Sequence, residues 1–428
     1  MRIWVIKTGE PIPYLPEEAQ DRFLRSGQMV RTLLAAGHDV TWWSARFYHQ
    51  KKSMRAAPSD TLIPGTGNTP ASDAVASPDI FLLNSLGYRR HIGPARLIDH
   101  AQLARGFARH APTLARPGLI VASWPTIELA DAAVRFGAQH GIPVVLDIRD
   151  LWPDIIYAKL NTILPFRTNG FLLRYERMGR RSFRGAHGVT GLSQGMIDWA
   201  RDRFGGTGVD RVFHQSMTPP QLDDTTRSAA RAWWRTKGVD LDAPKTRLVW
   251  SGSLVPETDG RTLLAALDAL PPKVAREIEV ILCGTGSLVP EIEALAARAP
   301  HVVYAGWVEA DRLAALTEAS HIGLLCYLDR FDFRNSVPNK VVDYCAGSMR
   351  ILTNLGGEVP RLLDGTGTVI PYPTGDVAGL GAILTQIAID AERYRVKHPP
   401  ARAAFDAHFD TRRVLADYVT YVEELART

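Results

Sequence analysis

The sequence has few cysteines and lacks any long apolar run. Its three cysteines, Cys283, Cys326 and Cys345, lie far apart in apolar surroundings, which excludes a zinc-ligand spacing and a disulfide framework. Thiols that stay unpaired fit a reducing compartment, so we expect a cytoplasmic protein. No apolar stretch reaches the about 18 residues that a membrane-spanning helix needs, and the run from Ile3 to Ile6 is too short for a signal peptide. Any membrane contact is therefore expected to be peripheral, on the inner face of the plasma membrane.

The sequence also lacks a strong charge of either sign. Its 50 Lys and Arg residues against 45 Asp and Glu residues give a formal net charge of +5, which permits a nucleotide or an anionic membrane surface as a partner and gives no reason to expect a nucleic acid. Hydrophobic residues make up 46% and charged residues 22% of the chain, as in folded rather than disordered proteins. At 428 residues, the chain exceeds the size at which single cores stop growing, so two domains are expected.

What the sequence does contain is a repeated alternation of short apolar runs with segments of helical periodicity. The runs are RIWVI, DVTWW, GLIVAS and PVVLDI in the first half and RLVWSG, EVILCG, HVVYAG and IGLLCY in the second. Strands that alternate with helices predict parallel sheets covered on both faces. The expected fold class is therefore α/β, with two Rossmann-like, doubly wound domains.

Breaks in this alternation predict the domain boundaries. We expect an N-terminal domain over residues 1–205, an interdomain region over 206–246, a second domain over 247–400 and a C-terminal helix over 401–428 that packs back on the N-terminal domain. A further irregular segment, from Lys51 to Asp79, is either a functional excursion or a mobile surface insertion.

Small and polar residues follow the strands of the second half, where doubly wound folds bind their ligands. Gly252 and Ser253 follow the first of these strands, Gly284 and Gly286 the next, and Trp307 the third. Glycine lets backbone amides approach a phosphate or a base, and helix starts favour anions. We expect these loops to bind a phosphate-bearing ligand.

The same runs resemble a known family. The stretches VWSGSL, VILCGTGSLVPEI, VVYAGWVEADRLAALTEASHIGLLCY and SVPNKVVDYCAGS are similar to the donor domain of family-4 glycosyltransferases, and AAGHDVTWW, VVLDIRDLWPDI and KTGEP resemble members from bacterial surface-polysaccharide pathways. The resemblance implies the GT-B fold, in which two Rossmann-like domains face a central cleft. It also implies transfer of a sugar from a nucleotide diphosphate donor, with retention of configuration.

In the family, a Glu before the turn of SVPNKVVDYCAGS contacts the donor sugar, and a second Glu eight residues later holds the ribose hydroxyls. The corresponding residues here are Asn335 and Asp343, which departs from the family pattern. Asp343 can still accept from ribose hydroxyls, whereas Asn335 brings no charge near a developing oxocarbenium ion, and Asp332 is the candidate substitute. The alternative is that Asn335 caps a turn and that Asp343 is a solvated helix residue. The intervening segment, expected to hold the diphosphate, consists of Ser336, Val337, Pro338 and Asn339.

Basic residues near this turn are candidates for binding the leaving diphosphate. Lys340 lies in the first helical turn, where a cation is unfavourable unless an anion is present. Arg261, later than the usual family spacing, and Arg334 are further candidates, with a solvated arginine as the alternative. No carboxylate stands out as a nucleophile. The resemblance therefore favours a front-face reaction in which Lys340, Arg261 and the glycine-loop amides stabilise the leaving group.

Polar pairs follow the strands of the first half and are expected to face the cleft as acceptor-binding residues. They are Gly9 and Glu10, Ser123 and Trp124, and Arg149 and Asp150. Asp150 is a candidate for orienting or deprotonating an acceptor hydroxyl, and Trp152 for stacking on a sugar ring. The alternatives are that Asp150 caps the following turn and that Trp152 belongs to the core. His100, in a helical setting, is expected to be a packed residue.

We expect neither a metal nor a cofactor. The string Asp240-Leu-Asp242 is the Asp-x-Asp pattern of metal-dependent sugar transferases, but it lies in the polar interdomain region rather than at a strand end. A basic helical segment is either a contact for anionic lipid or a solvated face. The arginines that follow helical three-to-four spacing in it are Arg174, Arg177, Arg181 and Arg184.

The leading hypothesis is a metal-independent glycosyltransferase that acts on a saccharide or lipid-linked saccharide in surface-polysaccharide biosynthesis. The candidate catalytic residues are Asp150, Asn335 and Lys340. One alternative is a sugar-nucleotide epimerase of the same fold, and another is a two-lobed solute-binding protein, against which the absence of an export signal counts.

Overall fold

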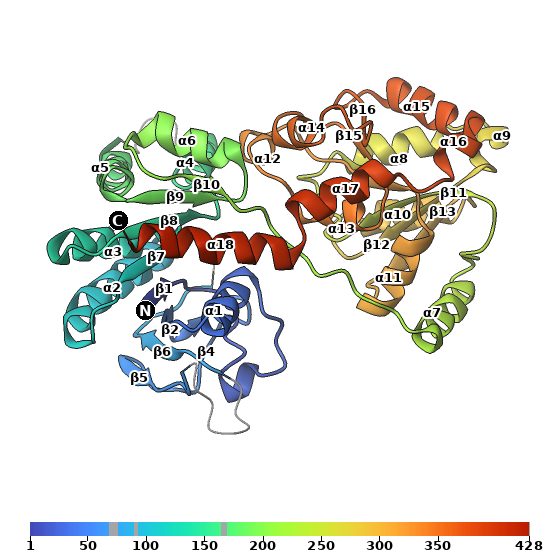
Figure 1. The fold of residues 1–428 in the computed structure, drawn as a ribbon. Helices are drawn as coiled ribbons and strands as arrows, with labels where there is room; N and C mark the ends of the chain where they lie inside the picture. The colour runs from blue at the N-terminus through green and yellow to red at the C-terminus, as the bar shows by residue number, and fades with distance from the viewer. Residues whose placement is uncertain (68–75, 90–92, 164–168, 428) are drawn as a thin grey trace. The chain divides into compact units, whose positions relative to one another are not determined.

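The chain folds into two α/β units, each built on its own mainly parallel sheet (Figure 1). The computed structural model describes residues 1–67, 76–89, 93–163 and 169–427, with the side chains of 159–172 left out of the description. Unit 1 comprises residues 1–214 and 412–428, and unit 2 comprises residues 215–411. No helix among the described residues is long and apolar enough to cross a bilayer.

Unit 1 has an eight-stranded sheet in the order β10-β9-β8-β7-β1-β2-β6-β5, parallel except for the antiparallel pair β5–β6. Its strands are β1 (Arg2–Ile6), β2 (Asp39–Ala45), β5 (Thr61–Ile63), β6 (Asp79–Leu83), β7 (Leu119–Trp124), β8 (Val144–Ile148), β9 (Gly188–Gly191) and β10 (Arg211–Val212), with a separate hairpin of β3 (Phe47–Tyr48) and β4 (Ser53–Met54). Its helices are α1 (Arg25–Ala35), α2 (Pro94–His110), α3 (Ile127–His140), α4 (Asp154–Ile163), α5 (Asn169–Gly185), α6 (Gln194–Phe204) and α18 (Thr411–Leu425).

The core of unit 1 lies on both faces of this sheet, as expected for a parallel sheet between helices. Alternate residues of β1 point to opposite faces: Trp4 packs in one cluster, and Ile3 and Val5 in the other. Helix α18 covers part of the second face, where its Tyr418 ring lies 5.0 Å from that of Phe213. The last helix of the chain is therefore part of the N-terminal unit.

Unit 2 has a six-stranded parallel sheet in the order β13-β12-β11-β14-β15-β16. Its strands are β11 (Thr246–Ser251), β12 (Ile278–Cys283), β13 (Val302–Gly306), β14 (Ile322–Leu325), β15 (Arg350–Thr353) and β16 (Val369–Pro371). Its helices are α7 (Asp224–Thr236), α8 (Gly260–Asp268), α9 (Pro272–Ala275), α10 (Val289–Ala296), α11 (Ala310–Ala319), α12 (Phe331–Arg334), α13 (Asn339–Ala346), α14 (Glu358–Leu362), α15 (Val377–Ile389), α16 (Ala391–Tyr394) and α17 (Pro399–His408).

The boundaries differ in two places from those expected. Residues 206–246 do not form one interdomain region, because 206–214 belong to unit 1 and 215–246 to unit 2. Helix α7 packs on α11 there, with the fully buried Trp234 donating its indole N–H to the carbonyl of Arg312 at 2.8 Å. The end of the chain contains two helices rather than one, since α17 packs on α13 in unit 2 before α18 crosses to unit 1.

The segment from Lys51 to Asp79 is more ordered than its composition predicts. It contains β4 and β5, and β5 pairs with β6. Arg55 is 2% exposed and forms a 2.6 Å ion pair with Glu18. Residues 68–75 of the segment lie outside the described part. The segment therefore contributes a strand and a buried charge pair to unit 1.

Candidate functional site

A polar pocket of about 230 Å³ lies at the carboxyl ends of the unit 1 strands. It is lined by loops that follow β1, the β3 strand, β6, β7 and β8, together with helix α2. This is where parallel α/β sheets bind ligands. The lining residues are Lys7, Thr8, Gly9, Glu10, His49, Tyr88, Arg96, His100, Pro125, Thr126, Arg149 and Asp150.

Four predicted acceptor residues, Gly9, Glu10, Arg149 and Asp150, therefore meet at one pocket. Gly9 has a φ of 84°, the left-handed region that favours glycine. This turn carries Glu10 to the start of α1, where its carboxylate accepts from the Ser26 amide at 2.9 Å.

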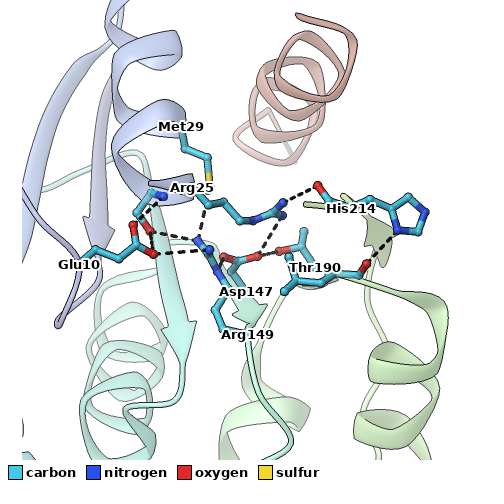
Figure 2. Close-up of polar contacts among 9 residues, drawn as sticks. Glu10, Arg25, Met29, Asp147, Arg149, Thr190 and His214 are labelled. Atoms are coloured by element: carbon cyan, nitrogen blue, oxygen red, sulfur yellow. Dashed lines mark hydrogen bonds and ion pairs between the residues drawn. The ribbon is translucent and has the colours of Figure 1, made fainter. Parts of the chain in front are cut away.

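A buried charge network supports this wall of the pocket (Figure 2). Asp147 is fully buried, forms an ion pair with Arg149, and accepts from the Thr190 hydroxyl at 2.9 Å. Arg25 lies 3.6 Å from the same carboxylate and donates to the carbonyl of His214 at 2.8 Å. The network thus connects α1, β8 and β9 with His214, the last residue of the first stretch of unit 1.

Burial and charge act in opposite directions within this network. Burial alone raises the pKa of the Asp147 carboxyl, but the neighbouring Arg149 and Arg25 outweigh it and hold that pKa below its usual value. Burial lowers the pKa of Arg25 to about 10 and also lowers the pKa of Lys7, which lines the pocket. Burial also acts to lower the pKa of Arg149, but Asp147 and Glu10 outweigh it and the net pKa is raised, so this pocket cation is already compensated by carboxylates.

The aromatic residues predicted to bind an acceptor lie in the core instead. Trp124 is completely buried, and its indole N–H donates to the carbonyl of Trp152 at 2.7 Å. Trp152 is 5% exposed and the Arg96 guanidinium lies 4.4 Å from the centre of its ring. Ser123 is also buried and does not line the pocket. The packing disagrees with the expectation that Trp124 faces the cleft, because strand position alone does not show which face of the sheet a side chain takes, and it agrees with the alternative that Trp152 belongs to the core.

His100 is packed, as expected from the sequence, but neither it nor several other pocket residues were predicted to line a site. His100 is 3% exposed, lies 3.6 Å from the carboxylate of Glu128, and accepts from Arg96 Nε at 3.2 Å. Burial raises the pKa of Glu128, but His100 and the Tyr175 hydroxyl outweigh it and the net pKa is lowered. The only sequence signal was the polar composition of a helix that faces a strand end, which is too common to single out these residues.

In unit 2, the predicted glycines serve close contact between two loops. A Cβ at Gly284 would lie 1.8 Å from the Gly252 carbonyl oxygen, and one at Gly286 would lie 2.0 Å from that of Leu254. The amides of Gly252 and Gly284 already donate to the carbonyls of Cys283 and Gly306. These two amides are therefore not open donors for a diphosphate, contrary to the expectation for the glycine loops.

Lys340 extends from α13 to these loops. Its Cε would be 3.1 Å from a Cβ placed at Gly252, and its Nζ lies 3.4 Å from the Tyr327 hydroxyl and 5.7 Å from the centre of the Trp250 ring. Burial lowers the pKa of Lys340 to about 8. The charged form of Lys340 is poorly solvated here, and an anion bound nearby would stabilise it.

Helix α13 begins at Asn339 after the predicted Ser336–Pro338 turn, and its start has no side-chain cap. The first amides of such a helix have no partner within the helix and point to its N-terminal side. Asp343 lies one turn further on the same helix, and Asn335 ends α12, with its side-chain nitrogen donating to the Phe331 carbonyl at 2.8 Å. The predicted donor segment is thus a turn followed by the start of α13, and Lys340 is the second residue of that helix.

The remaining basic candidates are held on the surface of unit 2. Arg261 is 69% exposed and forms a 2.8 Å ion pair with Glu291, which is the solvated-arginine alternative rather than a phosphate clamp. Arg334 pairs with Asp329 at 2.9 Å, and Arg330 pairs with Asp332 at the same distance.

Other predicted positions on unit 2 are open. Trp307 is 75% exposed after β13, and Ser253 is exposed after β11. Asp240 and Asp242 face arginines of α7 rather than a strand end. Within the described residues, no group of three or more His, Cys, Asp or Glu side chains could hold a metal ion.

Comparisons with known proteins agree with this architecture. The family model of the glycosyl transferase 4-like domain matches residues 25–214. Sucrose-phosphate synthase of Thermosynechococcus elongatus is 14% identical with a TM-score of 0.64, over 99% of this chain and 98% of that chain. HepE of Anabaena, solved in complex with UDP, is 13% identical with a TM-score of 0.63, over 99% of this chain and 100% of that chain. WaaG, a glycosyltransferase involved in lipopolysaccharide biosynthesis, is 14% identical with a TM-score of 0.59, over 99% of both chains. Among curated proteins, no sequence matches this one significantly.

These findings confirm the predicted GT-B fold with two Rossmann-like domains. They also confirm the resemblance to family-4 glycosyltransferases, since residues 25–214 match the model of the glycosyl transferase 4-like domain. Fold and domain together support a glycosyltransferase of the GT-B type.

Proposed function

We propose that the protein transfers a sugar from a nucleotide diphosphate sugar to a saccharide or lipid-linked saccharide, with retention of configuration and without a metal or cofactor. We further propose that it works in surface-polysaccharide biosynthesis at the cytoplasmic face of the membrane. HepE, a structural neighbour, was solved with UDP and with UDP-glucose, and WaaG acts in lipopolysaccharide biosynthesis.

The observation that carries the proposal is the place of Lys340. A lysine whose pKa is lowered to about 8 by burial lies beside the uncapped start of α13 and the loop at Gly252. A diphosphate bound there would stabilise both the ammonium group and the first amides of the helix. Asp343, one turn along the helix, is the residue proposed to accept from the ribose hydroxyls.

In the proposed reaction, the bond between the anomeric carbon and the diphosphate oxygen breaks, and the acceptor hydroxyl forms the new bond on the same face. The hydroxyl proton passes to the departing diphosphate, whose charge Lys340 stabilises. Asp150, in the polar pocket of unit 1, would orient the acceptor hydroxyl.

The test is product analysis with the purified full-length chain, a panel of nucleotide diphosphate sugars and a bacterial lipid extract. The proposal predicts release of nucleoside diphosphate together with a lipid product heavier by one sugar unit. It also predicts that Lys340→Met loses most of the activity and that Lys273→Met, an exposed lysine of α9, keeps it. Formation of an isomerised sugar nucleotide without an acceptor would instead support the epimerase hypothesis.

A further inference from the structure

Lys340 differs from two other basic candidates of unit 2 in the partners of its charge. Arg261 and Arg334 each form an ion pair with a carboxylate, at 2.8 and 2.9 Å. Among the described residues, no carboxylate forms an ion pair with Lys340, and its ammonium group donates to the Tyr327 hydroxyl at 3.4 Å. A carboxylate offsets the charge that a cation presents to a further anion, whereas a neutral hydroxyl leaves that charge in place. Of these three residues, Lys340 therefore keeps its charge for a ligand.

Two aromatic rings flank the ammonium group of Lys340. Its Nζ lies 5.2 Å from the centre of the Tyr327 ring and 5.7 Å from the centre of the Trp250 ring. A ring face attracts a cation at such distances without neutralising it. The end of the side chain also lies against Gly252, where an added Cβ would be 3.1 Å from Lys340 Cε. The two rings and the glycine loop thus confine a side chain whose four-carbon stem is otherwise flexible.

Tyr327 is itself held at both its backbone and its ring. Its amide donates to the side-chain oxygen of Asn354 at 3.0 Å, and its carbonyl accepts from the side-chain nitrogen of Asn354 at 2.5 Å. The same nitrogen lies 3.2 Å from the carboxylate of Asp259, which is 7% exposed. The Tyr327 ring lies 4.6 Å from the ring of Phe333 in α12. Contacts at both ends of the residue keep its hydroxyl in one place.

We propose that Tyr327 is a positioning residue of the donor site in unit 2, and that its hydroxyl and ring hold the Lys340 ammonium group against the Gly252 loop for the leaving diphosphate. Asn354 and Phe333 in turn hold Tyr327. This rests on the proposed function, because the diphosphate is the ligand that Lys340 is proposed to bind. The positioning partners are neutral, so the diphosphate is the first anion to form an ion pair with the lysine.

The charge state of Lys340 depends on groups from several elements. Burial lowers its pKa to about 8, while the Cys326 thiol after β14 and the Asp343 carboxylate on α13 act to raise that pKa. Burial raises the pKa of Tyr327, so its hydroxyl stays neutral over the range in which the lysine titrates. A hydrogen bond to the charged form of a group favours that form. Removing the Tyr327 hydroxyl should therefore lower the pKa of Lys340 further.

The test is Tyr327→Phe, which removes the hydroxyl and keeps the ring. Calorimetry of the full-length chain with UDP, GDP, ADP and CDP identifies the diphosphate that binds most tightly, and its affinity is then measured between pH 6.5 and 9.5. We expect an affinity loss of roughly 3- to 10-fold at pH 7, the contribution of one hydrogen bond. We also expect the fall of affinity with pH to begin about 0.5 to 1 pH unit lower than in the unmodified chain.

The matched control is Tyr394→Phe in α16. The Tyr394 ring also lies near a cation, 5.4 Å from the Arg350 guanidinium. This variant should bind the diphosphate with the affinity and the pH profile of the unmodified chain. Unchanged affinity and an unchanged pH profile in Tyr327→Phe as well would overturn the proposal.

A double variant with Lys340→Met separates positioning from a general effect on packing. If Tyr327 acts through Lys340, Tyr327→Phe costs no further affinity in a chain that already has Lys340→Met. Phe333→Leu loosens the packing of the Tyr327 ring and should show the same dependence on Lys340, which provides a second variant if Tyr327→Phe does not fold. Equal losses with and without Lys340 would overturn the proposal.

The positioning role and the proposed function fail separately. Diphosphate binding that needs Lys340 but not Tyr327 would reject the positioning role and leave the transferase. Coupled losses at the two residues, without sugar transfer from any donor, would reject the transferase and leave an anion site built from Lys340 and Tyr327. Absence of diphosphate binding by the unmodified chain would overturn both.

Discussion

At the scale of single residues, buried charges shape both candidate sites. Asp147 is completely buried between Arg25 and Arg149, and these cations keep its pKa low in spite of burial. In unit 2, Lys340 has a lowered pKa and its Nζ lies 3.4 Å from the Tyr327 hydroxyl. One site has a carboxylate shared by two cations, and the other has a cation suited to an incoming anion.

The substitution Asp147→Asn should strongly destabilise unit 1. It removes the negative charge that Arg25 and Arg149 share, and a broken buried ion pair costs about 3–5 kcal/mol. Urea unfolding followed by circular dichroism measures the loss. The matched control is Asp198→Asn, an exposed residue of α6, which should change the free energy of unfolding by less than about 0.5 kcal/mol. Equal losses of unfolding free energy in the two variants would show that the buried charge network does not stabilise unit 1.

Nucleoside diphosphate affinity should fall as the pH rises through about 8, the pKa of Lys340. Below that pH the lysine is charged and attracts the diphosphate. Above it, binding must first take up a proton, which lowers the affinity by up to about tenfold per pH unit. Calorimetry between pH 6.5 and 9.5 measures this profile.

The same profile should be flat and weaker by about 10- to 100-fold in Lys340→Met, whereas Lys273→Met should keep the slope. A slope near pH 8 that survives in Lys340→Met would assign the titration to another group.

At the scale of elements, the loops after β11 and β12 of unit 2 interlock through glycines. The amide of Gly252 donates to Cys283, that of Gly284 to Gly306, and that of Leu254 to Thr285. Since these loops leave no room for a Cβ at Gly284, their glycines fix the position of the loop that Lys340 touches. The glycine pattern of the sequence indicates the right loops, but for loop packing rather than for amide donation to phosphate.

Gly284→Ala should therefore displace the β11 loop and weaken nucleotide binding. Its new Cβ would lie 1.8 Å from the Gly252 carbonyl oxygen, and the residue has a φ of 131°. We expect a loss of more than about 1 kcal/mol of stability. Thermal melting and nucleotide titration measure the two effects.

The matched control is Gly381→Ala in the interior of α15, where no atom lies within 4 Å of the new Cβ. It should raise stability by up to about 1 kcal/mol. Tight nucleotide binding by Gly284→Ala would contradict the interlocked-loop account.

At the scale of the whole molecule, the sequence predicts the architecture better than the site. Hydrophobic periodicity and turn residues predict two α/β units with parallel sheets, because each strand and each helix has a local sequence pattern. The partners of Tyr88, which include Lys52 from a hairpin and Arg96 from α2, leave no such pattern because they meet only in the folded chain. For the same reason, the sequence could not show that Arg261 pairs with Glu291 or that Trp124 points into the core.

The most direct test of the central claim is thermal stabilisation of the purified chain by a panel of nucleoside diphosphates, with and without magnesium. A ligand bound only by the folded state raises the melting temperature. We expect a clear rise with one diphosphate that does not depend on magnesium and that is lost in Asp343→Ala but kept in Asp364→Ala, an exposed control. No rise with any diphosphate, or a rise that persists in Asp343→Ala, would contradict the assignment of unit 2 as the donor-binding unit.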